Sequence, residues 1–509
     1  MQFDLLVIGG GVSGLSTVYH LLKQQSTIKD QNSKRIKTIC LLEAKNRLGG
    51  RIQTSRTKID EEKIEIGANW IHGIIDNPVF EFLTRNKIID TTIESNKSNY
   101  NIEARSSTGE VIDDELVYKV YEVYSRMLNN AARFHNDLSR LDEINFFSDS
   151  MGNYLHGEIE KYILSENITI RPLIRKLFDS LLKRETCISG CDSMNDVSLQ
   201  YFSQYKEYLG GNVIIPKGYH SLITSMLNEI DDLDCDIGKN KKSFQYFLQS
   251  EVIKIEWPGL DRSQIPSNSN VILTKFPLKI QCKNGFSFEA NHVVLTIPLG
   301  SLQKNLANLF SPPLPQYKLE CVQRMGFDVV DKIFLEYSHK STIVDKFFRN
   351  GKKIDEIMLL WTDDDTEYCS KKFWYKKIYS IYCISDHCLQ LWVSGKEARH
   401  MEQLDDREVN EQLTKELRSI FGDSNFPLAD NVIVTRWGSD PCTLGSYSYI
   451  RQHSTVDDID KLAEPIYLHP DDDLPLIVFG GEATHRDYFS TVHGAFLSGR
   501  SCASKFTAM

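Results

Sequence analysis

The first fifty residues carry a strand, a glycine turn, a helix and a second strand in direct succession, and this pattern constrains the fold most strongly. Residues 3–8 predict a buried strand, residues 13–25 a helix, and residues 38–43 a second strand with the apolar continuity of a parallel sheet. The turn has the spacing GxGxxG, formed by Gly9, Gly11 and Gly14. Backbone amides at such a turn, together with the helix N-terminus, can approach a pyrophosphate closely. The sequence therefore predicts a βαβ dinucleotide-binding unit.

Two features after the helix indicate which dinucleotide binds. Glu43 ends the second strand, where its carboxylate would accept both ribose hydroxyls and disfavour the ribose phosphate of NADP. The polar stretch 26–37 reads as a surface insertion that lengthens the spacing to this acid. Gly49, Gly50 and Arg51 then follow at once, so a loop can close over a diphosphate and add positive charge, which favours FAD over NAD. The alternative is an ordinary surface turn with a solvated arginine.

The remaining chain changes character twice. Residues 112–190 have helical periodicity, whereas residues 250–395 read as short strands of a mixed or antiparallel sheet. Those strands are expected at 271–275, 278–282, 292–298 and 328–337. A helix at 408–421, strands at 432–437 and 476–479 and a helix beginning near Ser490 complete the chain. The return to an apolar strand followed by glycine predicts that both termini build one domain.

Composition bounds the class of protein. A chain of 509 residues is long for one core, and 41% hydrophobic with 25% charged residues is typical of a soluble globular protein. The net charge of −10 argues against nucleic-acid binding and suits a cationic substrate. The closest pairs among eleven cysteines, Cys187/Cys191 and Cys383/Cys388, lack CxxC spacing, so we expect no metal site and a reducing compartment. Without a signal peptide, a long apolar run or an SKL ending, the expected location is the cytoplasm, with the nucleus left open and no membrane contact.

Five ordered motifs carry a resemblance that covers residues 3 to about 505. They read LLEAKNRLGGRIQT, IGANWIHG, HVVLTIPLGSL, RWGSDPCTLGSYSY and VFGGEATHRDYFSTVHGAFLSGR. In this order they resemble the flavin amine oxidase superfamily, and most closely its polyamine oxidase branch of animal spermine and acetylpolyamine oxidases. The resemblance implies an α/β fold in which an FAD-binding Rossmann-like domain of the glutathione-reductase type is interleaved with a substrate domain of mixed β-sheet flanked by helices. The FAD domain would comprise residues 1–85, 211–300 and 431–509, and the substrate domain residues 86–210 and 301–430.

The resemblance also implies a set of residues around non-covalent FAD. They are Gly9, Gly11, Gly14, Glu43, Arg51, Gly67, Ala68, Asn69, Trp70, Val252, Trp437, Glu482 and Val492. The turn 480–482 between an apolar strand and the last helix is itself suited to an anion or ribityl group, although an ordinary strand-to-helix turn is equally compatible with these residues.

Lys332 and His72 are the candidate catalytic residues. Lys332 lies among apolar residues of an expected strand; in the resembled family the matching lysine holds a water near the flavin and assists reoxidation, and desolvation would depress its pKa. Without the resemblance, a solvent-facing lysine on an edge strand would be favoured. His72 matches a histidine beside the substrate amine and could bind its nitrogen without being an obligatory base; a structural histidine is the alternative.

Further residues are implied to contact the substrate. Tyr447 matches an aromatic that flanks the substrate before the flavin, and Ser490 and Thr491 match hydroxyl contacts of the animal branch. The animal enzymes carry a Phe-Gly-acid-aromatic element where this chain has Gln204 in place of the acid, so Glu207 is the candidate substitute. A buried ammonium needs such a carboxylate. The choice between spermine, acetylspermine and spermidine stays open.

The resemblance implies an activity and a set of rivals. Polyamine oxidation by hydride transfer to FAD, with molecular oxygen giving hydrogen peroxide, an aminoaldehyde and a shorter amine, is the expected function of a monomeric enzyme. A monoamine oxidase would need a flavin-linking cysteine where Ser446 aligns, although Cys442 lies close, and also a C-terminal membrane helix. A histone demethylase would need a long helical insertion. An amino-acid oxidase or a non-catalytic FAD-binding scaffold remains as an alternative, the latter disfavoured by Lys332 and His72.

Overall fold

The initial strand lies inside an eight-stranded sheet. β1 (Gln2–Ile8) pairs in parallel with β2 (Ile39–Leu42) on one side and with β11 (Ser287–Leu295) on the other, and β11 pairs in parallel with β22 (Ile477–Phe479). Helices cover these strands, which therefore carry apolar residues on both faces. The remaining strands of this sheet are β8 (Phe244–Phe247), β9 (Val252–Glu256), β10 (Leu278–Cys282) and β12 (Phe310–Ser311).

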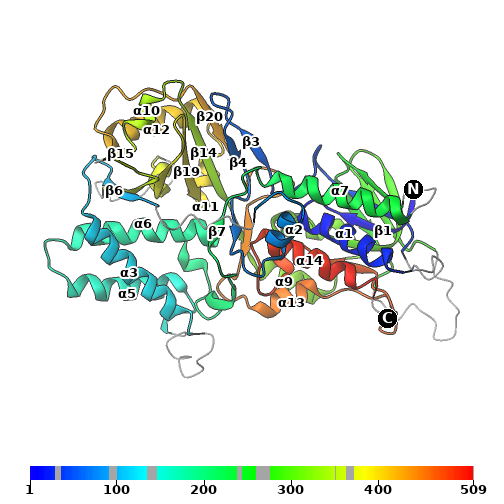
Figure 1. Ribbon diagram of the computed structural model, residues 1–509. Coiled ribbons are helices and arrows are strands. Elements are labelled where there is room, and N and C mark those ends of the chain that lie inside the picture. Colours follow the sequence, from blue (N-terminus) through cyan, green and yellow to red (C-terminus); the bar gives the residue numbers. More distant parts are fainter. Residues whose placement is uncertain are drawn as a thin grey trace.

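The N-terminal and C-terminal segments lie side by side in this part of the molecule (Figure 1). α1 (Val12–Ser26) packs on α14 (Val492–Ser504) and on α7 (His220–Ile237). The packing of α1 on α14 is close, because a Cβ at Gly499 would lie 2.3 Å from the carbonyl oxygen of Ser13. The computed structural model describes residues 1–28, 36–90, 100–134, 146–237, 243–259, 275–349, 351–362 and 372–507.

A six-stranded mixed sheet lies apart from the first one, at the upper left of Figure 1. Its strands in spatial order are β20 (Asn431–Val434), β14 (Val330–Glu336), β19 (Cys388–Ser394), β18 (Ser380–Ser385), β17 (Glu356–Leu360) and β6 (Ile102–Ser106). Only β17 and β6 pair in parallel among these described strands. α11 (Gly395–Met401) and α12 (Asp406–Ile420) pack against it, and α3 (Asp114–Ala131), α5 (Met151–Ser165) and α6 (Arg171–Ser189) lie below it.

Two-stranded pairs and further helices complete the described part of the chain. The two-stranded pairs are β3 (Thr54–Arg56) with β4 (Lys63–Glu65), β5 (Ile71–His72) with β7 (Asn212–Val213), β13 (Gly326–Asp328) with β21 (Tyr447–Tyr449) and β15 (Phe348–Arg349) with β16 (Lys352–Lys353). Further helices are α2 (Pro78–Arg85), α8 (Leu299–Leu309), α9 (Gln316–Arg324), α10 (Ser341–Val344), α13 (Val456–Ala463) and the 3-10 turns η4 (Met194–Asp196), η5 (Phe202–Gln204), η7 (Trp374–Lys377) and η8 (Glu482–Thr484). The pair β5–β7 joins residues 71–72 to residues 212–213, and the pair β13–β21 joins residues 326–328 to residues 447–449.

The α/β class predicted from the sequence is confirmed, but residues 250–395 do not form one sheet. β10 and β11 belong to the eight-stranded sheet and β14 to the six-stranded one. The strand expected at 292–298 begins at Ser287 and ends at Leu295, because Pro298 already caps α8. Residues 271–274 of another expected strand, and 29–35 of the expected insertion, lie outside the described residues. Two strands lie beyond the predicted domain boundaries at residues 300 and 430: β12 joins the eight-stranded sheet, and β20 joins the six-stranded sheet. The division of the chain into domains stays a prediction.

Candidate active site

The glycine turn leaves an open cradle at the start of α1. Gly9 has a φ of +109°, and a Cβ at Gly14 would lie 2.0 Å from the Gly9 carbonyl oxygen, so both positions require glycine. A Cβ at Gly11 would meet no atom within 4 Å. Gly11 is also the N-cap of α1, and no side chain caps the first-turn amides. Free N–H donors around open space are what a pyrophosphate needs, so this turn fits FAD.

Glu43 lies beside this cradle with a fixed carboxylate. Its Oε2 accepts the amide of Gly10 at 2.7 Å and its Oε1 accepts the amide of Lys45 at 2.8 Å. Each carboxylate oxygen has a second lone pair, so Glu43 can still accept ribose hydroxyls as predicted. The sequence did not identify Arg47, which bonds the carbonyl of Gly50 at 2.8 Å and thereby holds the predicted diphosphate loop.

An ion pair between Arg51 and Glu482 joins the first and the last of the five motifs. Nη1 of Arg51 donates to Oε1 of Glu482 and to the carbonyl of Ser446, both at 2.9 Å. The other oxygen of Glu482 accepts Ser448 Oγ at 2.6 Å and the amide of Ser490 at 2.7 Å. The alternative of a solvated arginine is wrong, because Arg51 is only 23% exposed and ion-paired. Both residues line one hollow.

Lys332 is a buried cation at the inner face of the second sheet. Its side chain is 3% exposed, and β14 pairs with strands on both sides, so the edge-lysine alternative is wrong. Nζ donates to the carbonyls of Glu65 and Gly67 at 2.6 Å each and to Oδ1 of Asn69. Burial lowers the pKa of Lys332 to about 7, and the negative charge of Glu65 partly opposes this. Lys332 therefore carries a readily exchanged proton beside the segment predicted to line FAD.

Aromatic rings connect Lys332 with His72. Nζ of Lys332 lies 4.6 Å from the ring centroid of Trp392, and Trp392 stacks on Trp70 at 5.7 Å with an interplanar angle of 13°. The rings of Trp70 and His72 lie 6.4 Å apart. Tyr447 packs near the same Trp392 cluster and donates its hydroxyl to the carbonyl of Cys187. These ring faces, which can attract a cationic amine, are compatible with a site for an amine and the flavin ring.

The negative charge of Glu207 acts on the pKa of both His72 and Glu185. Burial lowers the pKa of His72, while a hydrogen bond with Asn212 and the negative charge of Glu207 act in the opposite direction. Glu185, on α6, has a pKa raised to about 7, chiefly by burial; Arg184 lowers it and Glu207 raises it. Its side chain forms no hydrogen bond or ion pair with the described residues. Sequence reasoning missed Glu185, although it lies on the apolar stripe of the helix.

The remaining predicted substrate residues lie close by but are already engaged. Ser490 has a φ of +66° and donates its hydroxyl to the carbonyl of Ser448. Thr491 caps α14 by accepting the amide of Gly494 at 2.9 Å and donates to Tyr488. Gln204 is half-buried in η5, and Glu207 is exposed just beyond it. Their contacts with substrate stay predictions.

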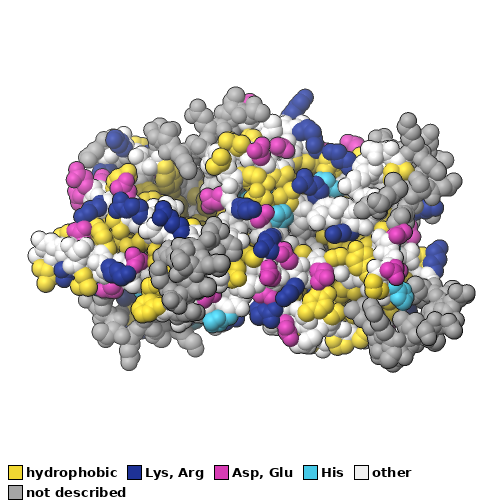
Figure 2. All heavy atoms as spheres, turned by 90° about the horizontal axis from the view of Figure 1, so that it is seen from below, with side chains coloured by type: hydrophobic (Ala, Val, Ile, Leu, Met, Phe, Trp, Pro, Cys, Tyr) yellow, Lys and Arg dark blue, Asp and Glu magenta, His cyan; other side chains and the backbone are white. Residues whose placement is uncertain are grey.

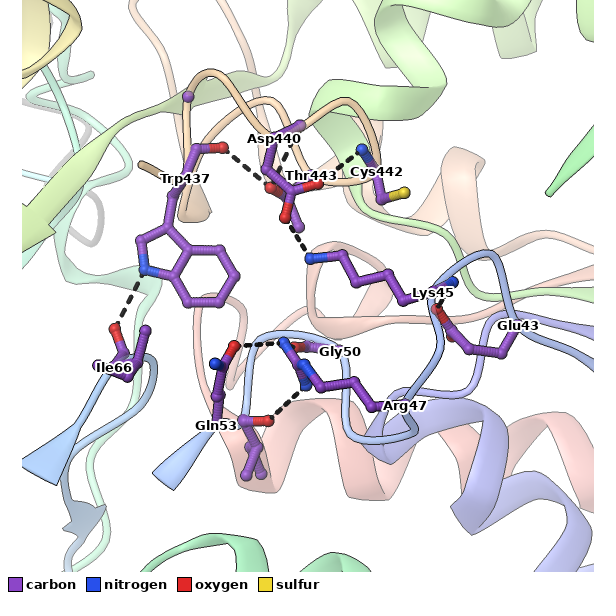
Figure 3. A network of polar contacts seen from close by, with 12 residues as sticks. Glu43, Lys45, Arg47, Gly50, Gln53, Ile66, Trp437, Asp440, Cys442 and Thr443 are labelled. Atoms are coloured by element: carbon purple, nitrogen blue, oxygen red, sulfur yellow. Dashed lines mark hydrogen bonds and ion pairs between the residues drawn. The ribbon is translucent and has the colours of Figure 1, made fainter. Parts of the chain in front are cut away.

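Four predicted cofactor residues complete the surroundings. Trp437 is 7% exposed and donates its indole N–H to the carbonyl of Ile66 at 3.1 Å (Figure 3). The amide of Ala68 binds the carbonyl of Arg51 at 3.2 Å, which holds the 67–70 segment against the glycine-rich loop. Val492 begins α14, and Val252 begins β9 in the eight-stranded sheet.

Comparison with known proteins identifies the family. The family model described as flavin containing amine oxidoreductase matches residues 12–505. The chain belongs to this family. FAD is its cofactor, in agreement with the open cradle at Gly11 and the carboxylate of Glu43.

Relatives match this flavin-containing amine oxidoreductase over nearly its full length. Proteins of Bos taurus and Homo sapiens named peroxisomal N(1)-acetyl-spermine/spermidine oxidase are each 30% identical, covering 97% of this chain and 93% of theirs. A protein of Arabidopsis thaliana named probable polyamine oxidase 5 is 26% identical, covering 97% and 96%.

Solved structures support the fold of this amine oxidoreductase. A wild-type putrescine oxidase bound to putrescine has a TM-score of 0.66 and 16% identity, with both chains fully covered. At this identity the likeness concerns the fold alone. Among the described residues, no helix has the length and apolar character needed to cross a membrane.

Proposed function

We propose that this FAD-dependent amine oxidoreductase oxidises polyamines such as spermine, acetylspermine or spermidine, using molecular oxygen as acceptor. Glu185 is the single observation that carries the proposal. Its carboxyl group is only 7% exposed and lacks an ion-pair partner among the described residues. The negative charge of Glu207 raises the pKa of both Glu185 and His72, so the three side chains lie within electrostatic reach of one another. A monoamine offers one nitrogen, whereas a polyamine offers a further ammonium for this carboxylate.

Charge balance explains why such a carboxylate indicates a cationic ligand. A buried carboxylate is costly unless a cation or several donors compensate it. Arg184, the neighbouring cation, already binds Glu356 at 2.8 Å, so it is engaged elsewhere. An ammonium arriving between Glu185 and Glu207 would be paired on both sides. Glu207 thus takes the role proposed for it in place of the missing acid at Gln204.

The residues around the aromatic rings perform the orienting steps. When bound, FAD would supply the acceptor for a hydride equivalent from the carbon beside the amine. Only a neutral amine can release that hydride easily, so the ammonium first gives its proton to solvent, and His72 can then hold the neutral nitrogen by a hydrogen bond. Trp70, Trp392 and Tyr447 exclude water and restrict the position of the alkyl chain. Lys332 holds or releases a proton at Nζ, which suits a role in reoxidation.

The names of the relatives support this substrate class and leave the preferred member to experiment. Two relatives are named for acetylated spermine and spermidine, and another for polyamines in general. Glu185 and Glu207 supply carboxylates for the ammonium groups of either free or acetylated chains. Non-covalent attachment of FAD agrees with Ser446, whose Oγ donates to the carbonyl of Val330 at 2.8 Å.

Oxygen-dependent turnover with a substrate panel tests the proposal. Spermine, N1-acetylspermine, spermidine and benzylamine are each incubated with the holoenzyme, and hydrogen peroxide and the amine products are quantified. Peroxide, an aminoaldehyde and a shorter amine, in equal amounts and only with polyamines, are expected. Turnover of benzylamine or an amino acid in preference to every polyamine would favour the monoamine or amino-acid oxidase alternatives. No turnover of any amine would favour the non-catalytic scaffold.

We propose further that the protein is a cytoplasmic monomer without nucleic-acid or membrane partners. On the face shown in Figure 2, basic and acidic side chains are interspersed and do not form a continuous basic surface. This arrangement does not suit a polyanion. The bovine and human relatives are named peroxisomal, so imaging of the tagged full chain beside a peroxisomal marker, and sedimentation of the purified protein, are the corresponding tests.

A further inference from the structure

Two buried carboxyl groups contact the backbone of Trp437 and Gly438, and neither belongs to the residues proposed to bind substrate. Asp331, on β14, is fully buried, and its Oδ1 accepts Thr435 Oγ1 at 2.8 Å and the amide of Trp437 at 3.1 Å. Glu402, the C-cap of α11, is 7% exposed; it accepts the amide of Gly438 at 2.6 Å and the hydroxyl of Ser439. The two acids therefore hold four residues of the connection that follows β20, between Thr435 and Ser439.

The second oxygen of Asp331 lacks a donor. Oδ2 is buried, and no N–H or O–H group of the described residues reaches it. The side chain that does approach it is Glu402, an acceptor when ionised; burial, followed by the hydrogen bond and the charge of Glu402, raises the pKa of Asp331 well above its usual range. Two ionised carboxylates cannot share a dry site, because both repulsion and desolvation oppose them. Arg436 offers no compensation, since it binds the Glu402 backbone carbonyl rather than its carboxylate.

We propose that Asp331 and Glu402 share one proton, and that this carboxyl–carboxylate hydrogen bond positions Trp437 and the strand carrying Lys332. The proton on Oδ2 of Asp331 supplies the missing donor, and Glu402 accepts it. Asp331 and Glu402 are positioning residues, because they act through Trp437 and Lys332 and do not touch the reacting atoms.

The contacts show how the pair transmits its effect. Thr435 Oγ1 donates to Asp331 and accepts the amide of Lys332 at 2.8 Å, so the same carboxyl group fixes the Lys332 backbone. The other polar groups of Trp437 are held independently: its indole N–H binds Ile66, and its carbonyl accepts Thr443 Oγ1 at 2.9 Å (Figure 3). Loss of the shared proton would leave two carboxylates that repel each other, and their separation would displace the backbone of Trp437 while its ring stays anchored.

Infrared difference spectroscopy of the holoenzyme at neutral pH tests the shared proton. Asp331→Asn keeps an acceptor for Trp437 and gives Glu402 an N–H donor in place of the O–H. The wild-type minus variant spectrum should contain the band of one protonated carboxyl group and no carboxylate band. Asp406→Asn is the control, because Asp406 is 51% exposed and ion-paired with Arg436, and its difference spectrum should show carboxylate bands. Carboxylate bands for Asp331→Asn would overturn the proposal.

Hydrogen exchange of the Trp437 and Gly438 amides tests the positioning role. Asp331→Ala should accelerate both by about threefold to tenfold, because the Trp437 amide loses its bond to a neutral carboxyl group and Glu402 loses the donor that holds it beside Gly438, and Asp331→Asn should restore slow exchange. Unchanged exchange in the alanine variant, or failure of asparagine to restore it, would contradict the role. If the alanine variant does not fold, the asparagine variant and the infrared result still decide. The inference rests on the FAD site and not on the amine, and neither measurement involves an amine, so its failure is distinguishable from failure of the proposed function.

Discussion

Substitution of Glu185 by glutamine gives the sharpest prediction for the substrate site. The change keeps the volume of the side chain and removes a carboxylate that is 7% exposed and lacks an ion-pair partner among the described residues. A hydrogen bond to a charged group is worth about 1.5–3 kcal/mol. At about 1.36 kcal/mol per decade, kcat/KM for spermine or acetylspermine should fall roughly 10- to 150-fold. Benzylamine or another single-nitrogen substrate should lose little.

Glu207→Gln is the comparison variant, because Glu207 is proposed to pair with the same ammonium but is exposed. Glu207 is exposed, and an exposed ion pair contributes about 0.2–1 kcal/mol, so kcat/KM should fall by at most about fivefold. Stopped-flow flavin reduction and steady-state turnover both measure the ratio, with flavin content and thermal melting as checks of folding. Equal losses for the two variants, or an equal loss for a single-nitrogen amine, would refute the reasoning.

The pH profile of the same variant provides an independent test. Burial raises the pKa of Glu185 to about 7, so this carboxyl is mainly protonated below pH 7 and mainly ionised above it. Only the ionised form attracts an ammonium. The wild-type kcat/KM for polyamines should therefore rise as pH increases through about 7, and this component should be absent from Glu185→Gln. An identical profile in both proteins would exclude Glu185 as its source.

Three further predictions concern the cofactor and the catalytic residues. Gly11→Val should bind no flavin but leave the melting temperature of the apoprotein unchanged, because its side chain enters the open space of the cradle. Gly14→Ala should lower the melting temperature, because its Cβ would lie 2.0 Å from the Gly9 carbonyl oxygen. Flavin content and melting curves check both variants. Lys332→Met should retain FAD but slow oxygen-dependent turnover on the order of 100-fold or more, and turnover at the wild-type rate would remove Lys332 from the mechanism. His72→Asn should reduce kcat/KM by about fivefold to tenfold through weaker amine binding, whereas complete loss of flavin reduction would make His72 an obligatory base.

The strand–turn–helix geometry of the glycine turn was predictable from the sequence because its determinants are local. Gly9, Gly11 and Gly14 follow a strand directly, and Glu43 ends the next strand, so spacing along the chain already fixes their proximity. The burial of Lys332 was much harder to predict. Its acceptors include backbone carbonyls of Glu65 and Gly67, about 265 residues earlier in the chain, and no sequence pattern identifies such partners.

Glu185 was missed for a different reason. Glu185 lies on the buried face of α6, and the spacing of that face predicts only core packing. The apolar residues of the same face are Ile174, Leu177, Phe178 and Leu181. The one sequence signal for a functional role was a carboxylate on an otherwise apolar helix face. Ser490 and Thr491 show the opposite limitation: motif position indicates substrate contact, but their hydroxyls are used by the turn and the helix cap that shape the site.

Anaerobic mixing tests the central claim most directly. The FAD-loaded protein is combined without oxygen with spermine, N1-acetylspermine, spermidine or benzylamine, and flavin absorbance is followed over one turnover. We expect at least one polyamine to bleach the flavin rapidly, benzylamine to leave it oxidised, and admission of air to restore the absorbance with release of hydrogen peroxide. Full oxidised absorbance with every polyamine would contradict the account.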